Sequence, residues 1–372
     1  MAAFPDVLPT RPNWLIRLAA SRRFQSFAAR VPGLRRIARA EGAALFDLVA
    51  GFVNSQTLMA LVELRILHLM FDGPLSVQQV AGICGVPADR MQVLLQAGAA
   101  LGLLKRHKDG SFGLSLRGAS MLGVPGLEAM IRHHRARYAD LADPVAFLRG
   151  GQQTQLSQFW PYVFGAEGAR DQTVAATYST LMSESQVLVA EDTLRLVNLS
   201  GVRRLMDVGG GTGAFLSAVA ARYPDMRLDL FDLPAVLGSA QTNLAGLQSR
   251  LTLHPGSFRD DALPVGADAI SLIRVLYDHD DATVLRLLSA VHQALPPQGR
   301  LVIAEPMSGG VNPDRTTDVY FAVYTMAMQT GRTRSGPEIA ALLTRSGFVN
   351  ICDKRGFRPF ITSAVTAEKP TV

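Results

Sequence analysis

The spacing of apolar positions changes about half-way along the chain. Over residues 41–70, and again over most of 116–200, apolar side chains recur at three- and four-residue intervals, which is typical of helices packed on one another. From residue 201 onward, short apolar runs alternate with helical patterns. The sequence therefore predicts a mainly helical first half followed by an α/β, Rossmann-like doubly wound sheet.

Strands in the second half are predicted where short apolar runs are bounded by turn residues. They are 203–208, 227–231, 251–254, 267–273, 300–305, 348–353 and 360–367. The clearest helix between them runs from Asp281 to Ala294. In such a sheet the ligand lies at the carboxyl ends of the strands, so the residues that follow each strand are the candidate contacts.

The first half contains the pattern of a winged helix. A capping box at Ser76–Gln79 opens a short helix, and Pro87 opens a second helix that continues to Leu103. Residues 104–114 then predict a short hairpin with a turn at Asp109-Gly110. Helix, turn, helix and hairpin in this order are typical of a winged-helix domain.

Winged helices often bind DNA, but this one lacks the necessary charge. Its second helix offers only Arg90 as a cation before Lys105. We therefore interpret residues 41–120 as the dimerisation domain of a homodimer, with no nucleic-acid partner. Residues 121–200 are a helical linker that contributes to a substrate pocket, and residues 201–372 are the catalytic domain.

Length and composition fit this division. A chain of 372 residues, 48% of them apolar, suits two or three domains and can bury a large core. Every stretch of eighteen residues contains a charged or strongly polar side chain, so we predict no membrane-spanning helix. Its two cysteines, Cys84 and Cys352, lack metal-ligand or redox spacing, which predicts no metal site and a reduced, cytoplasmic setting.

The positive charge is concentrated at the start of the chain. Residues 1–40 hold eight arginines against Asp6 alone, 8 − 1 = +7, which leaves about −1 for the remainder. Apolar residues recur there at roughly helical spacing, which predicts amphipathic helices with basic outer faces. Three interpretations of this basic arm stay open: docking on an anionic membrane surface, packing on a partner subunit, and a transit peptide.

A glycine loop follows the first predicted strand. The run from Asp207 to Gly213 reads Asp-Val-Gly-Gly-Gly-Thr-Gly, and Gly209 and Gly211 allow the backbone to approach a ligand closely. Asp232, nineteen residues after Gly213, is placed to accept hydrogen bonds from both hydroxyls of an adenosine ribose. The loop is therefore predicted to hold a cofactor.

The neighbouring strand ends narrow the choice of cofactor. Position 214 is alanine, so the third glycine of the dinucleotide fingerprint is missing. Leu233 follows Asp232, and Gly256-Ser257-Phe258 follows the third strand. Together these residues predict sites for the amino or sulfonium end, the ribose and the adenine of S-adenosyl-L-methionine, with no pyrophosphate clamp.

Several ordered motifs carry a family resemblance. They are Leu205–Gly213, Phe231–Pro234, Leu272–Leu276, Leu295–Arg300 and Gly331–Ser335. Residues 40–370 resemble the class I S-adenosylmethionine-dependent O-methyltransferases that carry an N-terminal winged-helix dimerisation domain, the family of the plant phenolic and acetylserotonin enzymes. Within it, the likeness is greatest to the branch that methylates bacterial photosynthetic pigments, carotenoids first and bacteriochlorophyllides next.

The resemblance implies further cofactor contacts. Arg274 matches a basic residue that contacts the cofactor in the family, with an ion pair to Asp232 or a neighbouring acid as the alternative. Met182 and Ser185 match a Met-x-x-Ser pattern that lines the edge of the cofactor site, and core packing is the alternative for Met182.

The resemblance also shows where this chain departs from the phenolic enzymes. Those enzymes continue the strand as Leu-His-Asp-Trp, and their histidine deprotonates the acceptor, whereas this chain has Leu-Tyr-Asp-His at 276–279. Glu305 keeps the family spacing of twenty-eight residues from Tyr277, and Thr333 replaces a second family glutamate. We predict Tyr277 and Glu305 as catalytic residues, with His279 as a displaced base or, alternatively, a cap residue.

The missing histidine bears on the acceptor. An aliphatic tertiary alcohol is a much weaker acid than a phenol, whose pKa is about 10, and gains little from a neutral imidazole. A cationic methyl donor reacts with a hydroxyl held in line, so positioning supplies much of the rate. Tyr277 is then expected to orient the acceptor oxygen, with plain packing as the alternative, and Asp278 to anchor the loop.

Two aromatic segments predict an apolar acceptor. Phe159 and Trp160 begin an aromatic run that continues to residue 164, and Tyr320 and Tyr324 lie in a helix predicted over 318–328. A helix that is apolar on most sides is usually buried. Beside the cofactor, both segments would line a channel for a long hydrocarbon, and core filling is the alternative for the first.

The combined prediction is a homodimeric O-methyltransferase acting on the tertiary hydroxyl of an acyclic carotenoid such as hydroxyneurosporene. Two alternatives within the fold stay open: a C-methyltransferase of a bacteriochlorophyll precursor, and an O-methyltransferase of another small hydrophobic hydroxyl compound. A nicotinamide oxidoreductase or a DNA-binding regulator would not account for Gly256-Ser257-Phe258 together with Glu305.

Overall fold

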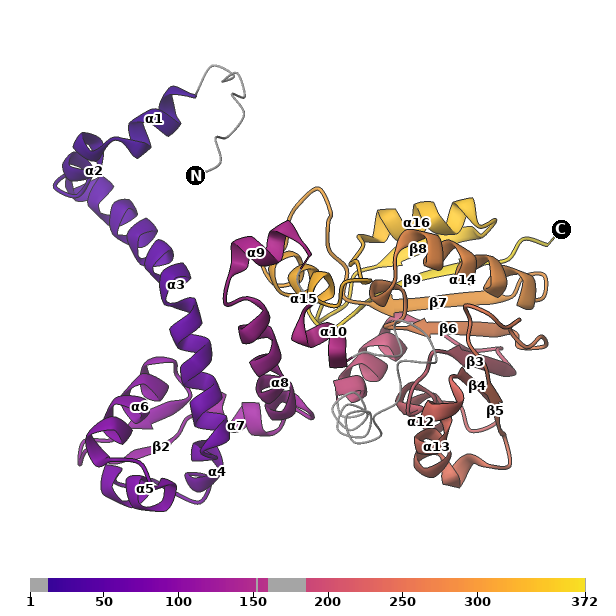
Figure 1. Ribbon diagram of the computed structural model, residues 1–372, viewed down its shortest axis with the longest axis horizontal. Coiled ribbons are helices and arrows are strands. Elements are labelled where there is room, and N and C mark those ends of the chain that lie inside the picture. The colour runs from indigo at the N-terminus through magenta and orange to yellow at the C-terminus, as the bar shows by residue number, and fades with distance from the viewer. Residues whose placement is uncertain (1–12, 152, 160–184, 372) are drawn as a thin grey trace. The chain divides into compact units, whose positions relative to one another are not determined.

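The computed structural model describes residues 13–151, 153–159 and 185–371 (Figure 1). The chain divides into two compact units, Met1–Ala119 and Ser120–Val372. The predicted helical first half and α/β second half are both present.

The first unit contains the predicted winged helix. Its elements are α1 (Trp14–Ala20), α2 (Arg22–Ala28), α3 (Pro32–Glu63), α4 (Ile66–Leu69), α5 (Val77–Cys84), α6 (Ala88–Ala100), β1 (Leu104–Arg106), β2 (Phe112–Leu114) and the start of α7 (Leu116–Leu122). The predicted capping box opens α5, where the Ser76 hydroxyl accepts from the Gln79 N–H and the Gln79 side chain accepts from the Ser76 N–H. The β1–β2 pair is the predicted antiparallel hairpin.

Helix α3 differs from the helix predicted over 41–70. It begins earlier, at Pro32, because proline suits the first turn of a helix. It ends at Glu63, since Arg65 takes a left-handed conformation with φ 54° that an α-helix cannot accommodate. The last residues of the basic arm, 32–40, therefore belong to the same helix as the first residues of the dimerisation domain.

Helix α3 also exposes a broad apolar face. Its exposed apolar residues include Leu45, Phe46, Leu48, Val49 and Phe52, each at least 64% accessible in the single chain. In the described part of the chain it is the one helix long and apolar enough, by length and composition, to cross a membrane, whereas the sequence analysis predicted none. A single helix of this kind is a weak indicator of a membrane span, because core helices meet the same criterion. An exposed apolar face of this size requires a partner of some kind.

The second unit is built on a seven-stranded sheet of order β5-β4-β3-β6-β7-β9-β8. The strands are β3 (Arg204–Val208), β4 (Arg227–Asp232), β5 (Leu251–Pro255), β6 (Ala269–Ile273), β7 (Arg300–Glu305), β8 (Val349–Lys354) and β9 (Ser363–Glu368). The pairs from β5 to β7 are parallel, and β9 runs antiparallel to β7 and β8. Every predicted strand is present, which confirms the predicted α/β class.

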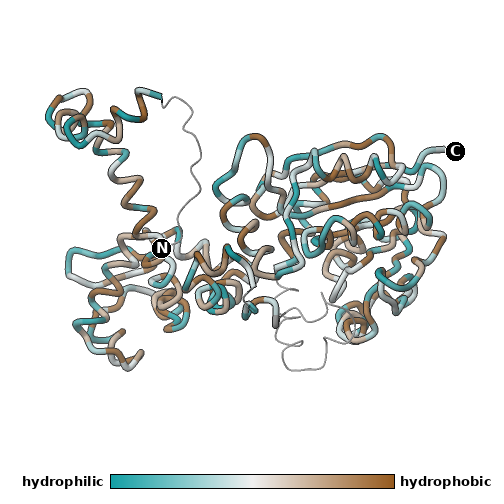
Figure 2. Tube along the Cα trace, turned by 45° about the horizontal axis from the view of Figure 1, so that its top comes forward, coloured by the Kyte–Doolittle hydropathy of each residue, from teal (hydrophilic) through white to brown (hydrophobic). Residues whose placement is uncertain are grey.

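Helices cover both faces of this sheet (Figure 1). Helix α12 (Ala214–Arg222), α13 (Pro234–Asn243) and the helical residues 185–196 pack with Leu205 of β3 on one face. Helix α14 (Asp281–Ala294) and α16 (Gly336–Arg345) pack with Met206 of β3 on the other. Successive strand residues point to opposite faces, so strands covered on both sides are mainly apolar, and hydrophobic segments run through this part of the chain in Figure 2.

Shorter helices complete the second unit. They are α8 (Leu127–Asp140), α9 (Pro144–Arg149), α10 (Gln155–Phe159), η3 (Ala245–Leu247), η4 (Leu276–Asp278), η5 (Thr317–Phe321) and α15 (Ala322–Ala327). The helix predicted over 318–328 is thus a π-helical turn, η5, followed by α15. Tyr324 and Met328 are buried as predicted, but Val319 and Met326 are 63% and 47% exposed. The expectation of burial on most sides was therefore correct for only part of this helix.

Candidate active site

The glycine loop has the backbone that its sequence requires. Gly209, Gly211 and Gly213 have φ values of 69°, 59° and 81°, in the left-handed region that favours glycine. At Gly210 an added Cβ would overlap the Asp207 carboxylate. The loop therefore leaves its backbone open at the carboxyl end of β3, where a ligand can approach it closely.

Two carboxylates lie at this loop, that of Asp207 buried and that of Asp232 half-buried. Asp232 accepts from the Gly211 N–H and from the Leu233 N–H, each at 2.7 Å. Asp207 Oδ1 accepts from the Ser271 hydroxyl at 2.6 Å, while Asp207 Oδ2 is buried without a hydrogen-bond partner among the described residues. Burial raises the pKa of Asp207 to about 7, opposed by the Ser271 hydrogen bond and increased by the charge of Asp232. The site thus offers acceptors for hydroxyl or ammonium groups.

Of the three predicted contacts that follow β5, only part lies beside the glycine loop. The N–H of Gly256 donates to the carbonyl oxygen of Asp232 at 3.0 Å, so Gly256 lies beside the predicted ribose contact. Ser257 is half-buried in the following turn. The ring of Phe258 packs edge-on against His279, with centroids 5.2 Å apart. Phe258 therefore packs toward the catalytic turn.

Four other predicted contacts are described partly or not at all. Ser185 is half-buried at the start of the described helical residues 185–196. Phe159 ends α10, but its side chain lies outside the described part of the structure, as do Trp160 and Met182 altogether. Their roles stay predictions.

Tyr277 lies in η4, a turn held from both sides. Its N–H donates to Glu305 Oε2 at 3.1 Å, and its carbonyl oxygen accepts from the Arg332 N–H at 2.9 Å. The side chain is 5% exposed. Burial, and next the charge of Asp278, raise the pKa of Tyr277 well above its ordinary value. The phenol therefore stays protonated and can donate a hydrogen bond.

Glu305, the last residue of β7, is fully buried. Burial raises its pKa to about 7, opposed by the charge of Arg334 and by the N–H group of Tyr277. Its described hydrogen bond is to backbone, so the geometry gives Glu305 a positioning role beside the predicted catalytic one. Glu305 Oε1 has no hydrogen-bond partner among the described residues.

Arg274 follows β6 in a left-handed conformation, with φ 57°. Its N–H donates to the carbonyl oxygen of Ala304 at 2.8 Å, and its Nη2 donates to that of Ile361 at 3.3 Å. The Arg274 charge opposes the burial that raises the pKa values of Asp278 and Glu305. Its described contacts thus place it beside the catalytic turn, and they do not include the alternative ion pair with Asp232.

His279 is poorly suited to be the displaced base. Its Nδ1 lies 3.1 Å from Arg259 Nη2, and since the guanidinium can only donate, this nitrogen is the acceptor. Burial and then the charge of Arg259 lower the pKa of His279 to about 3. His279 is 7% exposed and is the C-cap of η4, where its N–H donates to the carbonyl oxygen of Leu276 at 3.1 Å, so the alternative prediction of a cap residue is confirmed. His279 also packs behind the catalytic turn.

Sequence reasoning did not single out Arg334, which is fully buried. Its Nη1 donates to the carbonyl oxygen of Leu276 at 2.9 Å, and its Nη2 donates to that of His279 at 2.8 Å. Its Nε donates to Asp281 at 2.8 Å. Arg334 thus holds both ends of the turn that carries Tyr277. The sequence signal for Arg334 was its charge within the Gly331–Ser335 motif, and that motif was used above only for the family resemblance.

A second group missed from sequence joins α8 to η5 and α15. His133 Nε2 lies 3.2 Å from the Tyr324 hydroxyl, and His134 Nε2 lies 2.6 Å from the Tyr320 hydroxyl. The Arg137 guanidinium lies 4.2 Å from the ring centroid of Tyr320 and 5.2 Å from that of Tyr324. We term these five residues the His-Tyr cluster. It includes both tyrosines that were predicted to contact the acceptor.

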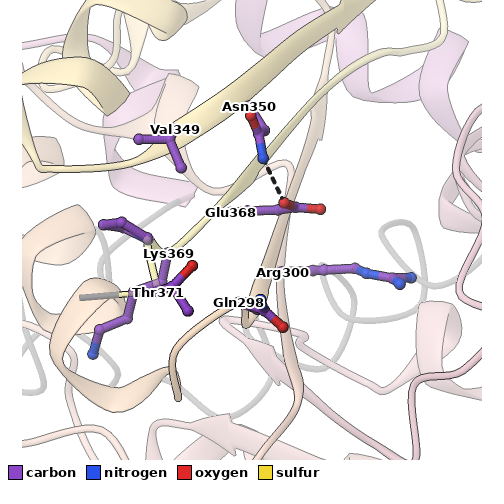
Figure 3. A pocket seen from close by; sticks show the side chains of 8 residues that line it. Gln298, Arg300, Val349, Asn350, Glu368, Lys369 and Thr371 are labelled. Atoms are coloured by element: carbon purple, nitrogen blue, oxygen red, sulfur yellow. Dashed lines mark hydrogen bonds between the residues drawn. The ribbon is translucent and has the colours of Figure 1, made fainter.

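A separate cavity lies at the other end of the sheet (Figure 3). Its volume is about 250 Å³, and its lining consists of Gln298, Arg300, Val349, Asn350, Glu368, Lys369, Pro370 and Thr371. Arg300 begins β7 and Glu368 ends β9, so this cavity is at the end opposite Glu305. It is polar and distant from the glycine loop along the strands, and it does not belong to the candidate active site.

Comparison with known proteins identifies the family. Residues 138–349 match the O-methyltransferase domain, and residues 46–120 match the O-methyltransferase dimerisation domain. The chain belongs to the O-methyltransferase family. The match to the second domain supports a homodimer and accounts for the exposed apolar face of α3.

Two bacterial relatives of this methyltransferase match along most of its length. A demethylspheroidene O-methyltransferase of Cereibacter sphaeroides is 62% identical over 358 residues, which cover 96% of this chain and 94% of the relative. One of Rhodobacter capsulatus is 53% identical, covering 98% of this chain and 91% of the relative.

A solved structure of similar fold contains the predicted cofactor. Human N-acetylserotonin methyltransferase in complex with S-adenosylmethionine aligns with a TM-score of 0.77 at 25% identity, covering 89% of this chain and 98% of that one. The methyltransferase uses S-adenosylmethionine. The open glycine backbone and the unpartnered Asp207 Oδ2 fit that ligand, with Asp232 placed for the ribose.

The raised pKa of Glu305 predicts a pH-dependent effect of Glu305→Gln on stability. Glutamine keeps an acceptor for the Tyr277 N–H but stays neutral, whereas wild type must bury a charged carboxylate as pH rises from 4.5 to about 7. The free energy of unfolding of the variant relative to wild type should therefore increase over that range and level off above it, by about 3 kcal/mol at most. Urea unfolding at several pH values measures this; a difference that is constant with pH would contradict it.

The hydrogen bonds by which Arg334 clamps the Tyr277 turn predict that Arg334→Lys is damaging although it keeps the charge. An ammonium cannot reach both carbonyl oxygens and Asp281 with the fork of a guanidinium. We expect a loss of about 2–4 kcal/mol in unfolding free energy and a fall in kcat of about 10–100-fold through misplacement of Tyr277. The matched control is Arg332→Lys, whose side chain is 49% exposed and should cost less than about 1 kcal/mol. Equal effects of the two substitutions would refute the clamp.

Proposed function

We propose that this methyltransferase transfers the methyl group of S-adenosylmethionine to the tertiary hydroxyl of an acyclic carotenoid of the demethylspheroidene type. The names of the two bacterial relatives, 62% and 53% identical over nearly the whole chain, support this acceptor. The observation that carries the proposal structurally is Tyr277, a protonated phenol rigidly held where the phenolic enzymes of the resemblance have a histidine base.

The chemistry of the acceptor fits a site without that histidine. When bound, S-adenosylmethionine supplies a methyl group on a positively charged sulfur, so the acceptor oxygen can attack without prior deprotonation. What the protein must supply is orientation of a weakly acidic hydroxyl. Tyr277 can provide it by a hydrogen bond, because Glu305 and Arg332 hold its backbone on both sides.

The surroundings fit a hydrocarbon chain. Tyr324 and Met328 belong to a buried apolar cluster with Phe147 of α9 and Leu156 of α10. In this proposal the linker over residues 121–200 contributes that wall of the acceptor pocket.

An acceptor assay tests the proposal. Wild-type protein is incubated with methyl-labelled S-adenosylmethionine and, separately, with hydroxyneurosporene in detergent, with a simple phenol and with a bacteriochlorophyll precursor. We expect label on the carotenoid as a base-stable methyl ether, at a kcat/KM at least about tenfold above that for the phenol. Label only on the phenol would overturn the carotenoid assignment, and label on carbon of the macrocycle would favour a C-methyltransferase.

We propose further that the basic arm, residues 1–40, docks a cytoplasmic enzyme on an anionic membrane surface. Helix α1 buries none of its residues, and Trp14 and Ile16 are 69% and 66% exposed in the single chain. Arginines lie beside these apolar groups, a combination typical of helices that lie in a lipid interface. A carotenoid dissolves in the membrane, so docking would bring the enzyme to its acceptor.

Vesicle binding tests the arm. The double variant Arg22→Gln/Arg23→Gln should bind anionic phospholipid vesicles at least about tenfold more weakly, because each cation near the surface contributes about 1 kcal/mol. Lys108→Gln, an exposed cation of the same unit outside the arm, is the control and should bind as wild type does. Equal affinity of wild type for neutral and anionic vesicles would contradict the proposal. Dissociation of the dimer in the double variant, measured by its mass in solution, would point instead to packing on the partner subunit.

A further inference from the structure

The His-Tyr cluster places polar groups within an otherwise apolar region. Tyr324 is 6% exposed and packs with apolar residues, and Arg137 of α8 is 9% exposed. Burying hydroxyl and imidazole groups costs free energy unless they are hydrogen-bonded, and such networks are retained where they specify a structure or take part in chemistry. The position of the cluster decides between these uses.

The cluster begins next to the catalytic turn. A Cβ at Gly331 would lie 2.7 Å from the carbonyl oxygen of Tyr277 and 3.1 Å from that of Thr325, so Gly331 packs between the turn and α15. Tyr324 contributes to the raised pKa of Tyr277, and Asp278 contributes to that of Tyr324. Tyr324 is therefore a neighbour of the catalytic turn, and His133 is hydrogen-bonded to its hydroxyl.

We propose that Tyr324 and His133 form the path by which the acceptor proton leaves during methyl transfer. This inference rests on the proposed function, since it assigns the proton of the acceptor hydroxyl. As the oxygen–methyl bond forms and the methyl–sulfur bond breaks, the hydroxyl proton passes to the Tyr324 oxygen. The Tyr324 proton passes to His133 Nε2 in the same step, so Tyr324 again carries one proton and His133 becomes an imidazolium. The imidazolium then releases a proton to solvent, which returns His133 to its neutral state.

A weak base is sufficient for this step. An alcohol oxygen that has gained a methyl group while keeping its proton is a much stronger acid than an imidazolium, so the base needs to be neutral and in place. Burial, and then the charge of Arg137, lower the pKa of His133 to about 4, so its imidazole is neutral at pH 7. The same low pKa favours proton release afterwards, and half-burial of His133 leaves it near solvent.

The second pair of the cluster provides a built-in comparison. His134 and Tyr320 are joined in the same way, and the Tyr320 ring lies parallel to that of Tyr324, at 8° and 6.3 Å. Burial raises the pKa of Tyr320, and the charges of Arg137 and then Arg274 oppose this. Because the Tyr320 ring stacks on that of Tyr324, we assign this pair to holding Tyr324 in orientation.

The test compares His133→Gln with His134→Gln in the full-length protein. Glutamine can keep a hydrogen bond to the tyrosine but cannot take its proton. With hydroxyneurosporene as acceptor, His133→Gln should lower kcat about 100-fold with both KM values within about threefold, whereas His134→Gln should lower kcat less than about fivefold. Tyr324→Phe should match His133→Gln, and the double variant should lose little more, because both act in one path.

A pH series separates proton transfer from structure. Between pH 6 and 9 the wild-type kcat should be level, because the base is already neutral, whereas the kcat of His133→Gln should rise with pH as hydroxide or buffer takes over. S-adenosylmethionine affinity and thermal unfolding of each variant establish that it is folded, and Tyr324→Phe stands in if His133→Gln does not fold.

The outcomes distinguish this inference from the proposed function. Wild type that fails to methylate the carotenoid overturns the proposed function, and this inference with it. Wild type that is active, with His133→Gln or Tyr324→Phe within threefold of its kcat, overturns the proton path alone. Equal losses in His133→Gln and His134→Gln, with KM raised and no change in pH profile, would mean a structural role and would also overturn it.

Discussion

The site depends on one short turn that is held by buried charges. Glu305 bonds the N–H of Tyr277 from the end of β7, and Arg334 bonds the carbonyl oxygens on either side of it. A turn alone would leave these backbone groups to water, and a buried ion costs free energy unless it is paired and hydrogen-bonded. Each buried charge therefore satisfies the turn, and the turn in exchange satisfies the charge. This mutual stabilisation fixes the position of Tyr277 more firmly than the short turn could by its own backbone alone.

Much of the fold could be predicted because its signals are local. The central strands β3, β6 and β7 are mainly apolar because they are covered on both faces, so they were visible as runs, and the left-handed glycines of the Asp207–Gly213 loop follow directly from its composition. The His-Tyr cluster was invisible for the opposite reason: His133 and Tyr324 are 191 positions apart, and no periodicity connects them. Arg334 was similar, since its partners lie more than fifty residues earlier in the chain. Tertiary pairing decides these roles, and a single sequence does not contain it.

The two units solve different problems of burial. In the second unit the sheet buries its own apolar surface under helices on both faces. In the first unit, α3 is too long to be covered by the small winged helix, and its apolar face from Leu45 to Val53 stays open in the single chain. This part of the chain matches the dimerisation domain of the family, which supports a homodimer, and a second subunit is a partner that could cover such a face.

The π-helical turn η5 has an evolutionary consequence. A π turn holds one more residue than an α turn within an otherwise helical segment, so a single deletion converts it to ordinary helix, and a single insertion creates it. Such a change would rotate the preceding residues by about 100° relative to α15 while leaving the rest of that helix in place. Residues Thr317–Phe321 are therefore a point at which the wall that we propose to face the acceptor can be re-aimed in one mutational step. Divergence in acceptor choice within this family need not proceed by side-chain replacement alone.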